Sequence, residues 1–261
     1  MVSLEERERA ETLRSAVEAS QTTTQLSQLL TPAETIERYR TPPKKTAFPL
    51  EYAFYLLGDV RGKTVLEYGC GDGENTVVLA NRGARVIAFD ISPELLAVAK
   101  ERLEVNRCEG VELLIGSAHN LPLPDESIDV VFGMAILHHL DLEIASREIR
   151  RVLKKDGRGI FEEPLRNSKL YAWARQFFPM QADVSPFERP LTDREIEDFA
   201  TSRPQRARTF QLLLSSVASV LPFRRQRAVR LCARLDTSLL RLVPLLNRYA
   251  TIKVFEMVKQ D

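Results

Sequence analysis

The sequence predicts a doubly wound α/β fold with a mostly parallel sheet, and three observations lead to that prediction. A short apolar run, Thr64–Tyr68, stops at three closely spaced glycines and is followed by a helical pattern from Asn75. A second apolar run ends in Asp90. Strand-like and helix-like segments then alternate as far as Pro164, and such alternation requires crossovers between parallel strands.

The chain ahead of this alternation is polar and helical. Residues 3–40 predict one or two amphipathic helices. The Pro42–Pro43 break then leads into a helix around Pro49–Leu57. We therefore separate a helical N-terminal block, 1–45, from a core domain, 46–165.

The remaining core elements follow from local signals. After the second strand, Ser92 is expected at the helix N-cap, Pro93 at the first helical position and Glu94 in the first turn of a helix running to Asn106. Strands three, four and five are expected over 111–115, 128–133 and 159–163, with a helix over 143–153 before the fifth.

The chain after Pro164 carries fewer signals. Thr192 and Glu195 form a capping box that predicts a short helix to Ala200. Strand six is expected within 206–214 and the last strand at 251–258. We assign 166–250, including the 167–180 segment, to a substrate cap and 251–261 to the end of the core sheet.

The glycine loop and the acid after the second strand describe a nucleoside pocket. Glycines Gly69, Gly71 and Gly73 leave bare backbone on which a ligand can lie close to the N–H groups of a helix N-terminus. Asp90 stands where a carboxylate accepts hydrogen bonds from ribose hydroxyls. Ligands of such sheets bind beyond the carboxyl ends of the strands.

The loop departs from the dinucleotide fingerprint, because Glu74 replaces its last glycine. Asp72 and Glu74 would repel a pyrophosphate and favour a cationic ligand. The run VLEYGCGDG from Val65 resembles the first motif of the class I, Rossmann-like S-adenosylmethionine methyltransferases. A nicotinamide-dependent Rossmann oxidoreductase is the alternative that the acidic loop disfavours.

Five further segments resemble that family in order and spacing, so the resemblance covers about residues 45–165. They are GSAH with LPLPD (116–125), IDVV (128–131), LHHL (137–140), RVLK (151–154) and FEEP (161–164). They are most similar to the small-molecule branch that includes ubiquinone and menaquinone C-methyltransferases. The resemblance implies seven strands with an antiparallel last strand, an N-terminal lid, S-adenosylmethionine as cofactor and S-adenosylhomocysteine as product.

The resemblance also implies which residues hold the cofactor. Glu67 is expected near its methionyl part, Asp90 and Ile91 at the ribose, and Met134 or Ala135 on the opposite side of the ligand. The backbone of Gly69, Cys70 and Gly71 is expected to approach it, with Cys70 a small filler rather than a nucleophile. Ser117 and Ala118 are expected to frame the adenine, although many relatives carry Asp where Ser117 stands.

Methyl transfer requires little side-chain chemistry, but some acceptors need a base. His138 and Glu163 are the candidate pair, because both lie at the carboxyl ends of neighbouring strands. The alternative is that His138 and His139 pack behind the acceptor pocket. His119 is expected to be exposed beside the adenine.

Composition fits one enzyme domain with additions. The chain has 261 residues, of which 44% are apolar and 28% charged. Its three cysteines and three histidines show neither metal-ligand spacing nor a disulfide framework, and the N-terminus lacks the apolar core of a signal peptide. We therefore expect no metal and a cytoplasmic protein. The longest apolar stretch, 212–223, is too short to span a bilayer.

The segment 203–248 is strongly basic. It holds ten arginines and one acid, a charge of +9 in a chain whose total is +1. Three interpretations stay open: a solvated arginine face over packed leucines, a face that docks peripherally on anionic membrane, and nucleic-acid binding. Nucleic acid is not expected, since aromatic residues are not interleaved with the arginines.

The sequence therefore predicts methyl transfer from S-adenosylmethionine to a small lipophilic or aromatic biosynthetic intermediate. A methyltransferase-like protein that binds the cofactor without transferring methyl is a second hypothesis, whether as a scaffold or adaptor or in other quinone-type chemistry. Pocket shape selects the acceptor atom, so C-, N-, O- and S-methylation all remain open, as does the oligomeric state.

Overall fold

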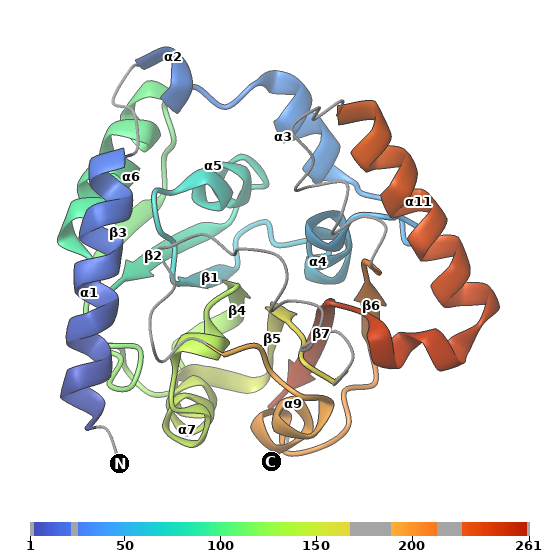
Figure 1. Ribbon diagram of the computed structural model, residues 1–261. Coiled ribbons are helices and arrows are strands. Elements are labelled where there is room, and N and C mark those ends of the chain that lie inside the picture. Colours follow the sequence, from blue (N-terminus) through green and yellow to red (C-terminus); the bar gives the residue numbers. More distant parts are fainter. Residues whose placement is uncertain (1–2, 22–25, 168–188, 213–225, 260–261) are drawn as a thin grey trace.

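The computed structural model describes residues 3–21, 26–167, 189–212 and 226–259. A seven-stranded sheet with the order β3-β2-β1-β4-β5-β7-β6 forms its centre (Figure 1). Strands β1 to β5 pair in parallel, β7 is antiparallel to β5, and β6 is antiparallel to β7. The predicted doubly wound fold with an antiparallel last strand is confirmed.

The strands lie where the apolar runs predict them. They are β1 (Thr64–Tyr68), β2 (Arg85–Asp90), β3 (Val111–Ile115), β4 (Ile128–Met134), β5 (Leu153–Pro164), β6 (Ala207–Phe210) and β7 (Ile252–Val258). The helices before the sheet are α1 (Leu4–Gln21), α2 (Leu26–Leu29), α3 (Ala33–Arg40) and α4 (Pro49–Leu57). Those within and after it are α5 (Glu74–Asn81), α6 (Pro93–Val105), α7 (Leu142–Val152), α9 (Asp193–Ala200) and α11 (Gln226–Leu242), with 3-10 turns η1 (Leu137–His139) and η3 (Pro244–Tyr249).

Two predicted helix starts are confirmed in detail. Ser92 Oγ accepts a hydrogen bond from the Leu95 N–H at the start of α6. Thr192 and Glu195 form the reciprocal capping box at the start of α9. The predicted beginning of the fifth strand was wrong, because α7 ends at Val152 and β5 begins at the next residue.

Helices cover both faces of the sheet and close two apolar cores. Helices α4, α5 and α6 cover one face, where Phe54, Phe132 and Ile160 belong to the same buried cluster. Helices α7 and α9 cover the other face, where Phe161 and Phe199 are buried (Figure 1). The sheet thus has both faces shielded, as its mainly parallel strands require.

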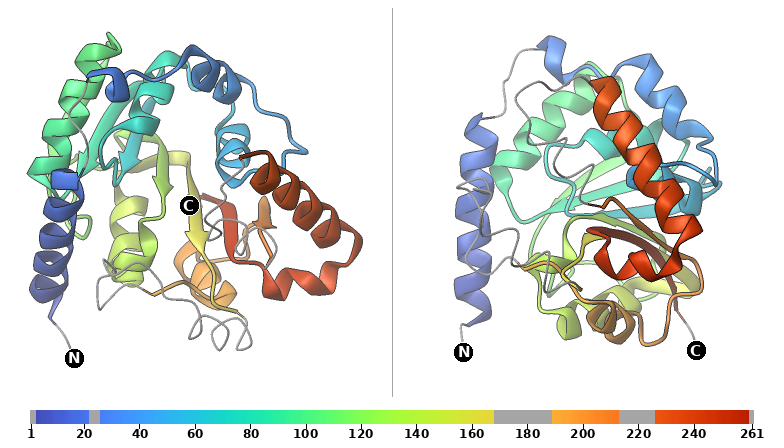
Figure 2. Two further views of the ribbon diagram at one scale, coloured as in Figure 1. Left: turned by 45° about the horizontal axis from the view of Figure 1, so that its top comes forward. Right: turned by 45° about the vertical axis from the view of Figure 1, so that its right-hand side comes forward.

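Two helices mark the opposite ends of the molecule. Helix α1 packs along α6 beside β3, and α11 packs against β6 at the far edge of the sheet (Figure 2). Across the described ranges, no helix has both the length and the apolar character needed to cross a bilayer. Parts of the expected substrate cap, 168–188 and 213–225, lie outside the described residues.

Candidate functional site

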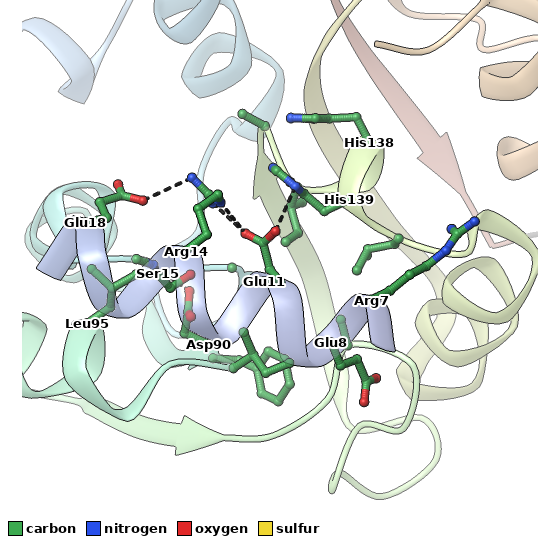
Figure 3. Close-up of a pocket in the computed structure, with 18 of the residues that line it drawn as sticks. Arg7, Glu8, Glu11, Arg14, Ser15, Glu18, Asp90, Leu95, His138 and His139 are labelled. Atoms are coloured by element: carbon green, nitrogen blue, oxygen red, sulfur yellow. Dashed lines mark hydrogen bonds and ion pairs between the residues drawn. The ribbon is translucent and has the colours of Figure 1, made fainter. Parts of the chain in front are cut away.

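A cavity of about 380 Å³ lies beyond the carboxyl ends of β1, β2 and β4, and α1 forms its outer wall (Figure 3). This volume is in the range of small-molecule sites. Of the residues expected at the cofactor, those that line the cavity are Gly69, Gly71, Asp90, Ile91, Ala118 and Met134. His138 lines it as well, whereas Glu67, Cys70, Ser117 and Glu163 do not.

The glycine loop presents bare backbone to this cavity. Gly69 has a φ of 78°, and a Cβ there would lie 2.9 Å from Ile136 Cδ1, so only glycine fits without displacing that side chain. Gly71 lines the cavity, and a Cβ there would meet no atom within 4 Å. The open space above Gly71 can therefore receive a ligand directly against the backbone.

Asp90 is fixed at the end of β2 by backbone donors. Its Oδ2 accepts from the Gly71 N–H and its Oδ1 from the Ser92 N–H, both at 2.9 Å. Burial, the largest influence, raises the pKa of Asp90 although these hydrogen bonds oppose the shift. Each oxygen retains acceptor capacity, so the carboxylate can also bind ligand hydroxyls.

Glu67 and Cys70 lie beneath the glycine loop. The Glu67 carboxyl is buried and accepts a hydrogen bond from Thr76 Oγ1. Burial, reinforced by Asp90 and Asp72, raises the pKa of Glu67 to about 8. Burial also raises the pKa of the Cys70 thiol far above its usual range, so this cysteine is not prepared to act as a nucleophile.

The structure corrects the interpretation of the two acids in this loop. Asp72 Oδ2 pairs with the buried Arg102 guanidinium at 2.6 Å, so its charge is neutralised within the protein. Glu74 is 75% exposed, and neither acid lines the cavity. The negative charge at the cavity comes instead from Asp90 and from α1, which contributes Glu8, Glu11 and Glu18.

Glu8 joins α1 to the end of β3. Its Oε1 accepts a hydrogen bond from Ser117 Oγ and lies 3.0 Å from His119 Nδ1. His119 was expected to be exposed, but it is buried. Its second ring nitrogen, Nε2, accepts a hydrogen bond from the Asp141 N–H at 2.9 Å, so both ring nitrogens have partners within the protein. Ala118 is held nearby by the Tyr68 hydroxyl, which donates to its carbonyl oxygen.

Glu11 joins α1 to the segment after β4. Its Oε2 lies 3.1 Å from His139 Nδ1, and its Oε1 accepts from Arg14 Nε at 2.8 Å (Figure 3). Burial opposes ionisation of Glu11, but the contacts with His139 and Arg14 outweigh it and lower its pKa to about 2. Arg14 also pairs with Glu18. The α1 wall carries three carboxylates, Glu8, Glu11 and Glu18, against the two arginines Arg7 and Arg14, so carboxylates exceed arginines by one.

His138 and Glu163 meet, as predicted from their strand ends. Glu163 Oε2 lies 2.7 Å from His138 Nδ1, and Oε1 accepts from the Ile136 and Leu137 N–H groups. Because a carboxylate only accepts, Nδ1 carries the proton and Nε2 is the basic nitrogen of neutral His138. Glu163 itself is fully buried and does not line the cavity, whereas its partner His138 does.

The α1 residues at the cavity were not identified from the sequence. The missed residues are Arg7, Glu8, Glu11, Arg14, Ser15 and Glu18. Their spacing of three and four places them on one face of a helix, and a search for polar residues at that spacing would have found them. In the described part of the chain, no cluster of three or more His, Cys, Asp or Glu side chains has the arrangement of a metal site.

Part of this chain matches a known protein family. Residues 66–161 match the methyltransferase domain family. A demethylmenaquinone methyltransferase of Thermobifida fusca is 38% identical over 100 residues, which are 37% of this chain and 42% of that protein. An uncharacterized methyltransferase of Bacillus subtilis, YcgJ, is 35% identical over 95 residues, 36% of this chain and 38% of that one.

The fold is also found in solved structures. The geranyl diphosphate C-methyltransferase of Streptomyces coelicolor A3(2), in complex with Mg²⁺, geranyl diphosphate and S-adenosylhomocysteine, aligns with a TM-score of 0.56 and 15% identity. That alignment covers 80% of this chain and 78% of the other. The matches to curated relatives span only 30% to 51% of the relatives' own lengths.

Proposed function

We propose that this chain, which carries a class I methyltransferase domain over residues 66–161, binds S-adenosylmethionine beneath α1 and transfers its methyl group to a small lipophilic or aromatic acceptor. The observation that carries the proposal is the cavity itself, in which bare Gly71 backbone lies beside the Asp90 carboxylate. An excess of carboxylates on its walls suits a cofactor with sulfonium and ammonium groups.

The cavity residues divide between the parts of the cofactor. Asp90 accepts from the ribose hydroxyls with Ile91 beside it, Met134 packs on the opposite side, and Ala118 lies along the adenine. Glu67 acts from beneath the loop, where its buried carboxyl is close enough to Asp90 to be influenced by its charge. Cys70 contributes only its backbone, which is fixed by the Cys70 N–H bond to Phe89 O at 2.9 Å.

Glu8 extends this assignment to the lid. Many relatives place an aspartate where Ser117 stands, and here the Glu8 carboxylate reaches the same point from α1 by accepting from Ser117 Oγ. We assign Glu8 as the acceptor for the adenine amino group, with Ser117 and His119 orienting it. Binding of the adenine and docking of α1 would then reinforce each other.

The protein's contribution to methyl transfer is orientation and exclusion of water. When bound, S-adenosylmethionine would supply a methyl group on a positively charged sulfur, and in-line transfer of that methyl to an acceptor atom would release S-adenosylhomocysteine. Helix α1 shields this space through its contacts with Ser117 and His139. His138, oriented by Glu163, receives the proton of an acceptor that must be deprotonated.

The lipophilic acceptor is inferred from two named proteins. One relative is a demethylmenaquinone methyltransferase, and the fold neighbour was solved with geranyl diphosphate. Both names describe small molecules with a prenyl-derived apolar part. The acceptor would enter next to His138, where the cavity wall is formed by the segment after β4.

A peripheral contact with anionic membrane is a second proposal, supported by α11. Its Leu231, Leu235 and Leu242 are 57%, 49% and 78% exposed and recur at helical spacing. The same helix carries Arg230, Arg234 and Arg241. An exposed apolar stripe with basic neighbours is typical of helices that lie in a membrane interface, where a lipophilic acceptor would be found.

Two measurements test the cofactor site and the transfer separately. Calorimetry with S-adenosylhomocysteine should show binding that Asp90→Ala weakens by about 1–3 kcal/mol, the range for a charged hydrogen-bond acceptor. Asp198→Ala, at an exposed position of α9, is the matched control and should bind normally. Unchanged affinity in Asp90→Ala would reject the ribose assignment.

Methyl-labelled S-adenosylmethionine incubated with cell extract tests the reaction. Label in an organic-soluble fraction supports methylation of a lipophilic acceptor. Label confined to macromolecules contradicts that acceptor class. Tight cofactor binding with no labelled product in any extract favours the scaffold hypothesis, and NADH binding in place of S-adenosylhomocysteine would favour an oxidoreductase.

A further inference from the structure

A second hollow of about 1120 Å³ lies along the edge strand β6, at the other end of the sheet from α1. We call it the β6 groove. Its walls come from the 44–45 loop, α4, the start of α9, the 203–209 segment with β6, α11, η3 and the start of β7. It shares no lining residue with the cavity under α1. Figures 1 and 2 show α11 and β6 side by side, far from α1.

The β6 groove is lined by an excess of cations. Seven basic side chains and one carboxylate line it, and that carboxylate, Asp193, is already paired with Lys253 Nζ at 2.6 Å. Asn167 Nδ2 donates a hydrogen bond to the other carboxylate oxygen of Asp193, Oδ2. Among the described residues, no carboxylate forms an ion pair with Lys44, Lys45, Arg208, Arg241 or Arg248. The chain as a whole has a net charge of only +1, so this concentration of charge is local.

Arg208 is the innermost of these cations. Its guanidinium lies over the rings of Phe210 and Tyr52, with Cζ 4.5 Å and 5.5 Å from their centroids. Nη1 donates to the Lys44 carbonyl oxygen at 3.3 Å, and Nη2 is buried with no hydrogen-bond partner in the described part of the chain. A buried donor without a partner costs stability, and one on a charged group costs more.

The charge of Arg208 persists in spite of this environment. Burial, followed by repulsion from Arg241, lowers the pKa of Arg208 to about 10, which still leaves it protonated at neutral pH. The aromatic rings hold its planar group in one orientation. A guanidinium that is held in one orientation and has no carboxylate partner among the described residues places a fixed positive charge at the groove, where it attracts an oxyanion.

We propose that the β6 groove is a binding site for a phosphate-bearing ligand, held by the positive charges of Arg208, Lys44, Lys45, Arg241 and Arg248, which line the groove without a carboxylate partner among the described residues. A carboxylate carries one charge and two oxygens, whereas a phosphate or diphosphate carries more of both and matches several cations that converge from separate elements. The phosphate belongs either to a phosphorylated small molecule or to a lipid headgroup.

Nucleic acid fits the same groove less well. Single strands are bound by aromatic faces on which bases stack. Here Tyr52 is the one aromatic residue among the described residues that line the groove, and Arg208 lies over its ring. Phe210, which also contacts Arg208, is fully buried and does not line the groove. The observations therefore favour a short anionic group over a polynucleotide.

Titration with inorganic pyrophosphate at low salt tests the site. The variant Arg241→Glu/Arg248→Glu changes two exposed side chains of the groove, and Arg147→Glu/Arg194→Glu makes the same charge change at exposed positions of α7 and α9. Calorimetry should show the pyrophosphate Kd rising about tenfold or more in the groove variant and staying within about twofold in the control. Equal losses of pyrophosphate affinity in both variants would overturn the proposal. So would the absence of pyrophosphate binding together with equal binding to vesicles that contain phosphatidic acid and vesicles that lack it.

A conservative change addresses the role of Arg208. Arg208→Lys keeps a positive charge but loses the planar fork, so pyrophosphate affinity should fall although folding, followed by thermal unfolding, is retained. If Arg208→Lys binds pyrophosphate as the wild type does, the anchoring role of Arg208 is wrong. S-adenosylhomocysteine binding should be unchanged in every groove variant, so this test stands or fails independently of the proposed methyl transfer.

Vesicles distinguish the two sources of phosphate. Flotation with phosphatidylcholine alone and with added phosphatidic acid asks whether the groove binds a headgroup. Binding only to the vesicles with phosphatidic acid, lost in the groove variant, identifies a lipid phosphate. Pyrophosphate binding without vesicle binding identifies a phosphorylated small molecule. A single-stranded RNA that binds tightly and is not displaced by pyrophosphate would reject the proposal in favour of nucleic acid.

Discussion

Replacement of Glu8 by alanine tests whether the lid completes the cofactor site. Glu8 lies on α1, and its Oε1 accepts from Ser117 Oγ and approaches His119 Nδ1 at 3.0 Å. If the carboxylate also accepts from the adenine amino group, Glu8→Ala removes a charged acceptor from the ligand. It leaves Ser117 and His119 in place on the core.

The expected loss is moderate because the Glu8 side chain is 26% exposed. A hydrogen bond to a charged group contributes about 1.5–3 kcal/mol, and partial exposure places Glu8 at the lower end. S-adenosylhomocysteine affinity should therefore fall roughly 10- to 30-fold. The same change at exposed Glu5, on the same helix, should have no effect on affinity.

Two comparisons separate ligand recognition from lid folding. S-inosylhomocysteine carries an oxygen where adenine has its amino group, so the wild type should bind it weakly and Glu8→Ala should lose that discrimination. Adding Ser117→Asp to Glu8→Ala returns a carboxylate to the core and should restore affinity for S-adenosylhomocysteine. Calorimetry measures both.

One result would refute the assignment of Glu8. If Glu8→Ala weakens S-adenosylhomocysteine and S-inosylhomocysteine by the same factor, the carboxylate does not read the amino group. Glu8 would then only dock α1 onto the core through Ser117 and His119. Hydrogen exchange of the α1 amides would show that docking loss directly.

Three further predictions concern β5. Burial and the neighbouring Glu163 raise the pKa of Glu162 to about 8 from 4.5, so between these pH values the folded state holds a proton that the unfolded state releases. The free energy of unfolding should therefore fall as the pH rises from 4.5 to about 8. In Glu162→Gln, urea unfolding should show a smaller fall, and an unchanged dependence of the free energy of unfolding on pH would contradict the shift. Glu163→Gln places amide hydrogens against backbone donors and should lower the free energy of unfolding by about 2–3 kcal/mol, more than His138→Ala does. Gly159→Ala puts a Cβ 2.5 Å from the buried Phe161 ring and should cost about 1–3 kcal/mol, partly recovered by adding Phe161→Leu; full stability of the single variant would show that the ring can move.

The core of the site could be predicted because its signals are local. Gly69, Gly71 and Asp90 follow directly on apolar strands, and parallel strands bring their carboxyl ends to one edge. For the same reason His138 and Glu163, 25 positions apart, were expected to meet and do so. Asp72 was misjudged because its charge depends on Arg102, which is 30 positions away on α6.

The sequence by itself determined the order of strands and helices, the glycine loop and the position of Asp90, because hydrophobic period, caps and glycine spacing act over a few residues. Only the tertiary structure decided that Glu8 contacts Ser117, across 109 positions, and that basic side chains from distant segments lie around Arg208. Such contacts depend on how whole helices pack and on which buried charges find partners. These long-range choices leave no periodic signal in the chain.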